Sequence, residues 1–182
     1  KEYRKISIPE LREMVSSLTN LRSQAIIVLQ LKLGLRAGEV TNLRLSDIRI
    51  DDAECTVGYP TLGSDPALNA RQNVLYIPSG EVREGNKSVR PRVLPLDSET
   101  RSVINRYLFA RPQNGEPWVF LSKKGHTQMT TKGVNQLWKD AFHPEYAETD
   151  EHRPVTSHFG RHRFTTFWRV EQDVNRQLVK YI

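Results

Sequence analysis

Cysteine is almost absent from this sequence, which has a single one, Cys55, among 182 residues. One thiol can form neither an internal disulfide nor a thiolate zinc cluster, and it fits a reducing, cytoplasmic compartment. There is no signal peptide, and the most apolar run, residues 25–34, meets Lys32 too early to cross a bilayer. No membrane association is therefore expected. Because the chain begins at Lys1 without a methionine, we expect a fragment of a longer protein.

Acidic residues are fewer than basic ones. Lys and Arg number 27 against 21 Asp and Glu, which leaves a net charge of +6. That excess favours a polyanionic partner such as nucleic acid, although many ordinary proteins are equally basic. The length suits one domain with a sizeable core.

Apolar spacing and turn residues predict a mainly α fold with a small antiparallel β-sheet, of the α+β class. Helices are expected at 8–19, 21–35, 37–44, 97–111, 130–142, 157–170 and 173–182. Strands are expected at 55–59, 73–78, 90–96 and 118–122, and residues 46–51 are expected to be a short strand or an extended segment. Between them we expect an exposed insertion at 60–73, a hairpin tip at 81–90 and a polar loop at 143–154.

The segment SHFGRHRFTTF, residues 157–167, concentrates positive and titratable side chains. In a helix, His158, Arg161 and His162 share one face, where like charges repel unless an anion lies opposite. Zinc binding by the two histidines is disfavoured, because the segment has no carboxylate or thiolate and Arg161 would repel the metal. His162 could instead be a hydrogen-bonded core histidine. Arg163 points off the shared face, toward solvent or a phosphate.

Two further segments carry isolated basic residues. Arg36 follows a Gly-Leu break at a predicted helix start, where backbone N–H groups already favour an anion. Glu39 could cap that helix or clamp the arginine, and an ordinary surface arginine is the simpler alternative. Lys87 lies at the predicted hairpin tip, followed by Arg90 and Arg92. Such a tip is usually only solvated, but it can also reach into a DNA groove.

Taken together, these segments resemble the catalytic domain of the tyrosine recombinase (phage integrase) family over essentially the whole chain. GLRAGEVTNLRLSDI (34–48) resembles the family's first arginine box, and NKSVRPRVLPL (86–96) resembles the turn that presents its lysine. SHFGRHRFTTF resembles the His-x-x-Arg-His box, and MTTKGVNQLWKDAF (129–142) resembles the helix that precedes it on DNA. The catalytic residues implied by the resemblance are Arg36, Lys87, His158 and Arg161, with Glu39 and His162 in support.

The resemblance also implies a chemistry. In that family a tyrosine hydroxyl attacks the scissile phosphate of duplex DNA, forming a 3′-phosphotyrosyl link and releasing a 5′-hydroxyl, without metal or cofactor. The two arginines would hold the non-bridging oxygens, Lys87 would protonate the leaving oxygen, and His158 would assist proton transfer. The further DNA-binding residues expected are Arg90, Arg92, Thr130, Thr131, Lys132, Asn135 and Arg163.

The family's nucleophile has no match in this chain. Tyr107 and Tyr146 precede the histidine box, and Tyr181 follows it too closely and fits core packing better. We therefore expect residues 1–182 to be a single catalytic domain that lacks the family's N-terminal DNA-clamping domain and its C-terminal tyrosine segment. The full-length protein would act as a homotetramer on nucleoid DNA, and this chain alone would be a monomer.

Three alternatives stay open. The first is a DNA-binding regulator on the same fold that has abandoned strand transfer. The second is a type IB topoisomerase-like enzyme, which shares the chemistry but is disfavoured by the short chain and the integrase-like boxes. The third is an ordinary basic helical protein in which the motifs occur by chance.

Overall fold

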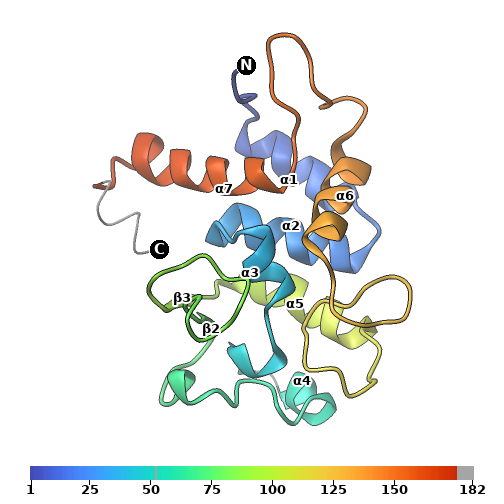
Figure 1. Cartoon of the computed structure of the whole chain (residues 1–182), viewed down its shortest axis with the longest axis vertical. Coiled ribbons are helices and arrows are strands. Elements are labelled where there is room, and N and C mark those ends of the chain that lie inside the picture. The colour runs from blue at the N-terminus through green and yellow to red at the C-terminus, as the bar shows by residue number, and fades with distance from the viewer. Residues whose placement is uncertain (52, 176–182) are drawn as a thin grey trace. The chain divides into compact units, whose positions relative to one another are not determined.

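The computed structural model describes residues 1–51 and 53–175, except for the side chains of residues 53–55. The helices are α1 (Ile8–Ser17), α2 (Leu21–Leu33), α3 (Ala37–Thr41), α4 (Ala53–Gly58), α5 (Ser98–Ala110), α6 (Thr131–Phe142) and α7 (Ser157–Thr166), shown in Figure 1. Short 3-10 turns η1 (Leu45–Asp47) and η2 (Pro66–Leu68), and a π-helical turn η3 (Phe167–Glu171), complete the helical elements of this part of the chain. The strands are β1 (Ile48–Arg49), β2 (Val74–Ile77) and β3 (Arg92–Pro95). The predicted α+β class with a small antiparallel sheet is confirmed.

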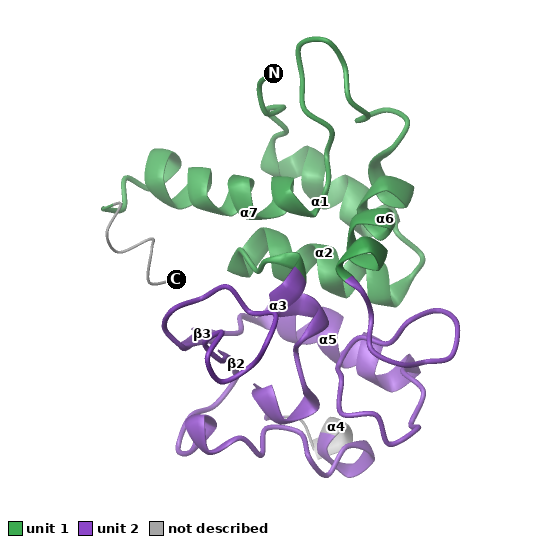
Figure 2. Cartoon of the chain, viewed as in Figure 1, with its two compact units in different colours: residues 1–37, 131–181 green, residues 38–130, 182 purple. Residues whose placement is uncertain are grey.

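The described chain divides into two compact units, coloured separately in Figure 2. Unit 1 combines residues 1–37 with residues from 131 onward, and unit 2 is the central stretch 38–130. Residues 1–37 and 131–175, which are far apart in the sequence, therefore fold together in one unit. That residues 1–182 act as one domain stays a prediction.

Helix α2 is the core of unit 1 and packs against α1, α6 and α7. Its side chains from Gln24 to Gln30 are all buried. The Asn20 side chain caps its start by accepting a hydrogen bond from the Ser23 N–H at 3.0 Å. Gly34 ends it in the left-handed conformation, with φ of +63°. Both ends of the central helix are thus fixed by local sequence.

Unit 2 is built around a three-stranded antiparallel sheet with the order β1-β2-β3. In the β2–β3 pair, Leu75 lies opposite Leu94, and both are buried. Helix α5 begins after Asp97, whose side chain accepts a hydrogen bond from the Thr100 N–H at 2.8 Å, as the predicted cap requires. The loop between β2 and β3 is the predicted hairpin, and it carries residues 78–91.

Two predicted strands are wrong. Residues 55–59 belong mostly to α4, where Val57 is 86% exposed, so the β-branched side chain that suggested a strand is not buried against a sheet. Val119, Phe120 and Leu121 are buried as expected, but residues 118–122 form only isolated bridges, at Trp118 and Leu121. Their backbone is satisfied by single hydrogen bonds, such as Val119 N–H to the Leu43 carbonyl at 2.9 Å, instead of a ladder.

Other boundaries also differ. The predicted strand 46–51 is a 3-10 turn followed by the two-residue β1, and the predicted helix 37–44 ends at Thr41. The insertion at 60–73 is not wholly exposed, because Leu68 is fully buried. Of the predicted last helix, residues 173–175 are not helical, and the rest, with Tyr181, lies outside the described residues. Among the helices described, none combines the length and apolarity needed to span a membrane.

Candidate functional site

Arg161 and the residues just before Arg36 meet in unit 1. Arg161, on α7, donates a hydrogen bond from Nη1 to the carbonyl oxygen of Gly34 at 2.5 Å. A Cβ atom at Gly34 would lie 2.5 Å from the ring of Phe164, also on α7. Only glycine therefore fits here, both for its positive φ and for the close approach of the ring. This contact brings the two arginine-bearing segments of the sequence together.

Arg36 itself is half-buried and follows the fully buried Leu35. The Leu35 carbonyl accepts a hydrogen bond from Gln30 Nε2 at 3.1 Å, and Gln30 Oε1 accepts one from Trp138 Nε1 at 2.6 Å. The backbone that carries Arg36 is thus fixed by side chains from α2 and α6. Sequence reasoning did not identify Gln30, although a glutamine in a wholly apolar run is a visible signal.

The two histidines of the box differ in environment. His158 is exposed in the first turn of α7, whereas His162 is half-buried and stacks on Tyr3, with ring centroids 3.7 Å apart. The Arg153 guanidinium lies 5.1 Å from the centroid of the Tyr3 ring. Burial lowers the pKa of His162 below its usual 6.5, and the nearby His158 and Arg153 lower it further. His162 is therefore biased toward the neutral form.

The other residues predicted to bind DNA from unit 1 lie on α6 and α7. Thr131 and Lys132 are exposed at the start of α6. Asn135, one turn further, accepts a hydrogen bond through Oδ1 from the Ser157 hydroxyl, so it ties α6 to the start of α7. Arg163 forms an ion pair with Glu171, Nη1 to Oε1 at 2.6 Å. That pairing favours a structural role for Arg163.

In unit 2, Glu39 joins α3 to the β2–β3 hairpin. Its carboxylate is buried, accepts a hydrogen bond from the Ser88 hydroxyl at 2.7 Å and forms an ion pair with Arg92 at 2.8 Å. The Arg92 side chain is only 8% exposed, so its location favours an internal role over DNA contact. Lys87 and Arg90 are exposed on the loop, and Thr130 is exposed just before α6.

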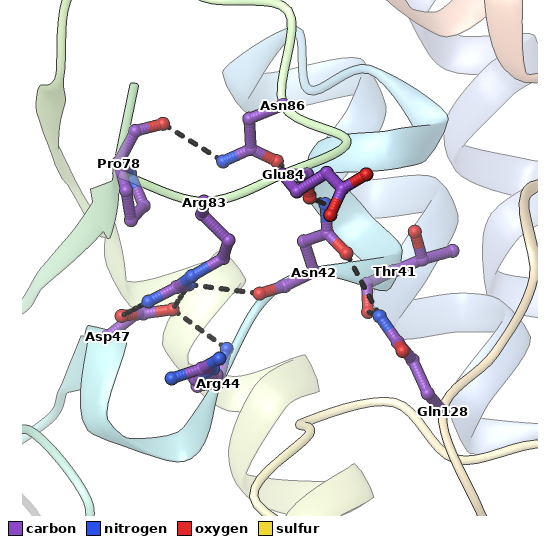
Figure 3. A network of polar contacts seen from close by, with 9 residues as sticks. All are labelled: Thr41, Asn42, Arg44, Asp47, Pro78, Arg83, Glu84, Asn86 and Gln128. Carbon is purple, nitrogen blue, oxygen red and sulfur yellow. Dashed lines mark hydrogen bonds and ion pairs between the residues drawn. The ribbon is translucent and has the colours of Figure 1, made fainter. Parts of the chain in front are cut away.

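A buried polar network supports the same hairpin and is not apparent from the sequence (Figure 3). Asn42 is its centre, and Asp47, Arg83, Asn86 and Gln128 surround it. Burial raises the pKa of Asp47, while its ion pair with Arg83 and a hydrogen bond from the Arg44 N–H act in the opposite direction.

The chemistry available in each unit follows from these contacts. In unit 1, Arg161 is aimed by a backbone carbonyl and shares its helix with an exposed histidine, a donor set suited to an oxyanion. In unit 2, the exposed ammonium of Lys87 lies on the loop between β2 and β3, whose neighbouring residues are hydrogen-bonded. There it can contact a phosphate or donate a proton. Within the described residues, no group of three or more His, Cys, Asp or Glu side chains is arranged to hold a metal ion.

Comparison with known proteins identifies the family to which this chain belongs. The phage integrase family matches residues 6–182, and the chain belongs to this family. The tyrosine recombinase XerA of Pyrococcus horikoshii is 26% identical over 173 residues, covering 94% of this chain and 49% of that protein. The tyrosine recombinase XerD of Caulobacter vibrioides is 31% identical over 86 residues, covering 44% of this chain and 27% of that protein.

Solved structures show the same fold. A crystal structure of XerA recombinase matches all of this chain and 56% of its own, with a TM-score of 0.70 and 18% identity. The Tn1549 transposon integrase, in complex with a circular intermediate DNA, matches all of this chain and 57% of its own with a TM-score of 0.69 and 17% identity. The fold is therefore that of a tyrosine recombinase, and this chain spans about half the length of the relatives it matches.

Proposed function

We propose that this chain is the catalytic domain of a site-specific DNA recombinase that cleaves and rejoins duplex DNA through a 3′-phosphotyrosyl intermediate. The observation that carries the proposal is the hydrogen bond between Arg161 and Gly34, because it places one predicted catalytic arginine on the backbone that leads to the other, Arg36. Family membership and DNA complexes of structural relatives, such as the Tn1549 transposon integrase, support it.

The proposed roles follow the chemistry of each group. Arg36 and Arg161 bind the non-bridging oxygens of the scissile phosphate and offset the charge of the pentavalent transition state. Lys87 donates a proton to the leaving 5′-oxygen, and His158, which is exposed, assists proton transfer at the attacking hydroxyl. His162, held by Tyr3, supports His158 from the next turn. The reaction needs no cofactor in this scheme.

The attacking tyrosine is proposed to lie downstream of residue 182. Tyr107 is a poor candidate because its ring is buried and its hydroxyl accepts a hydrogen bond from the Leu121 N–H at 3.2 Å. Tyr146 is half-buried, and its pKa is raised, first by burial and then by Glu145, which disfavours the reactive phenolate.

DNA is the proposed partner, contacted by Lys132, Thr131, Thr130 and Arg90 in addition to the catalytic groups. Because phosphate contacts should dominate, affinity should fall steeply as salt is raised. We also propose that the full-length protein forms a homotetramer on DNA, whereas this chain alone is a monomer by light scattering.

The test uses the full-length protein and a nicked suicide substrate that carries the DNA site on which the recombinase acts. We expect a protein–DNA adduct that survives denaturation, that disappears when one downstream tyrosine is changed to phenylalanine, and that is lost or strongly weakened in Arg36→Ala and Arg161→Ala. Arg106→Ala, an exposed arginine on α5, is the matched control and should form the adduct normally. Specific binding without any adduct would make the protein a DNA-binding relative instead.

A further inference from the structure

Lys87 is exposed, yet the residues on either side of it are fixed. Asn86, before it, is buried, and its Nδ2 donates to the Pro78 carbonyl at 2.9 Å. Ser88, after it, donates from its hydroxyl to Glu39 at 2.7 Å, and its carbonyl accepts from the Gly80 N–H at 2.8 Å. The backbone of Lys87 is therefore held at both neighbours.

Three amide side chains form a directed chain that ends at this loop (Figure 3). Gln128 Nε2 donates to the Thr41 carbonyl at 3.1 Å and to Asn42 Oδ1 at 2.9 Å. Asn42 Nδ2 then donates to the Glu84 carbonyl at 2.9 Å and to Asn86 Oδ1 at 3.1 Å. Asn86 Nδ2 in turn donates to the Pro78 carbonyl.

The orientation of each amide in this chain is determined by its neighbours. Backbone carbonyls at Thr41, Glu84 and Pro78 can only accept, so the nitrogen of each amide must face them. Asn42 is 9% exposed, and its two ends contact different segments, the loop on one side and Gln128 on the other. Its donor end is consequently aimed at the Lys87 loop.

Packing leaves the loop little freedom to relax around Asn42. A Cβ atom at Gly85 would lie 2.7 Å from Asn42 Nδ2, and one at Gly38 would lie 2.9 Å from the Gly85 carbonyl oxygen. On the other side, Arg83 Nη1 donates to the Asn42 carbonyl at 3.0 Å, and its guanidinium is paired with the buried Asp47. Side chain and backbone of Asn42 are thus both bonded to residues 83–86.

We propose that Asn42 is a positioning residue for Lys87, with Gln128 fixing the orientation of the Asn42 amide. The inference rests on the proposed function, because it assumes that Lys87 donates the proton to the leaving oxygen. In that step the tyrosine hydroxyl gives its proton to His158 as the tyrosine O–P bond forms, the P–O5′ bond breaks, and the Lys87 ammonium proton moves to O5′. A lysine displaced by about 1 Å would slow this transfer by up to roughly 100-fold.

The test is Asn42→Asp in the full-length protein. The carboxylate has almost the shape of the amide and can still accept from Gln128, but it cannot donate to Glu84 or Asn86. We expect cleavage of the suicide substrate at saturating DNA to slow by roughly 10-fold to 100-fold. On a substrate whose bridging 5′-oxygen is replaced by sulfur, the loss should shrink to within about threefold, because the weakly basic thiolate leaves without needing a proton.

Lys87→Ala serves as the reference, because its cleavage rate should also be restored on the substrate with a bridging 5′-sulfur. If Lys87→Ala is not restored, the proton-donor role itself fails and this inference with it. The other outcomes assume that sulfur restores cleavage by Lys87→Ala. If Asn42→Asp then loses the same activity on both substrates, or loses none on the oxygen substrate, the positioning role of Asn42 is overturned. The proposed function would still stand.

Two more variants keep the test decisive. Gln128→Glu removes the donor that orients Asn42, so it should show a smaller loss that sulfur also restores, and it takes the place of Asn42→Asp if that variant does not fold. Asn114→Asp removes an exposed amide donor from another loop of unit 2 and should cleave both substrates normally. Hydrogen exchange of residues 84–88 should accelerate in Asn42→Asp, and unchanged exchange would count against the proposal.

Discussion

The guanidinium of Arg161 is hydrogen-bonded to the carbonyl oxygen of Gly34, 127 residues earlier in the sequence, at 2.5 Å. A backbone carbonyl orients the guanidinium of Arg161 by a hydrogen bond and carries no net charge of its own. The same glycine ends α2 and lies under the Phe164 ring. One residue therefore sets the end of a core helix and the direction of a proposed catalytic side chain.

Gly34→Ala should destabilise the protein and disturb Arg161 together. The left-handed conformation and the crowding of the Phe164 ring should lower the free energy of unfolding by roughly 2–4 kcal/mol. Gly115→Ala is the control, because Gly115 also has positive φ, +78°, but nothing lies within 4 Å of its Cβ position. It should cost only about 1 kcal/mol. Equal losses for the two variants in urea denaturation would show that the ring contact is unimportant.

Gln30→Leu should destabilise unit 1 although it removes a polar group from a core. The substitution removes the Gln30 amide to which the Trp138 N–H and the Leu35 carbonyl are hydrogen-bonded, and both residues are fully buried. We expect a loss of roughly 2–6 kcal/mol, from about 1–3 kcal/mol for each of the two unsatisfied groups. Gln136→Leu, on the exposed side of α6, should change stability by less than about 0.5 kcal/mol. A stable Gln30→Leu variant would contradict this role.

Local signals in the sequence were enough for most helices. The cap at Asp97 and the apolar spacing of α5 predict its start within one residue, because these interactions are made between near neighbours. The segment 55–59 failed because β-branched composition does not tell whether a partner strand or a buried face is available. Val57, which looked like a strand residue, is exposed on a short helix.

In the candidate site, too, features set by neighbouring residues were predicted, whereas contacts between distant segments were not. The spacing within the His-x-x-Arg box places His158 and Arg161 on one helix, as expected from residues three positions apart. Arg92 looked like a DNA contact because a basic residue on a hairpin resembles one, but its partner Glu39 is distant in sequence and visible only in the fold. The contact between Asn42 and Gln128, 86 residues apart, could not be predicted from either segment alone.

Glu39→Gln should show how strongly α3 and the hairpin depend on their ion pair. The amide can still accept from Ser88, but it leaves the positive charge of the buried Arg92 without its carboxylate. Removing one partner of such a pair should cost roughly 3–5 kcal/mol. Arg92→Met combined with Glu39→Gln should recover part of that loss, which a double-mutant cycle measures. Strictly additive losses would indicate that the two side chains do not interact.

His162 should make the stability of the protein depend on pH. Its folded-state pKa is lowered from 6.5, so the unfolded chain binds the proton more readily than the folded one. The stabilisation that comes from neutral His162 is therefore complete above pH 6.5, and it is lost as pH falls from there through the lowered folded-state pKa. Urea denaturation at several values between about pH 8 and pH 5 should show the free energy of unfolding decreasing as the pH is lowered below 6.5.

Two variants assign this pH dependence to its cause. His162→Gln should remove most of the decrease, because no group at that position then titrates. Tyr3→Ala should weaken it, because the lost ring exposes the imidazole to water and brings its pKa back toward 6.5. The burial that lowers the pKa would then be shown to depend on the stacked Tyr3 ring. If the profile of His162→Gln matches that of the unmodified protein, another group is responsible and the stacking of Tyr3 on His162 has no part in it.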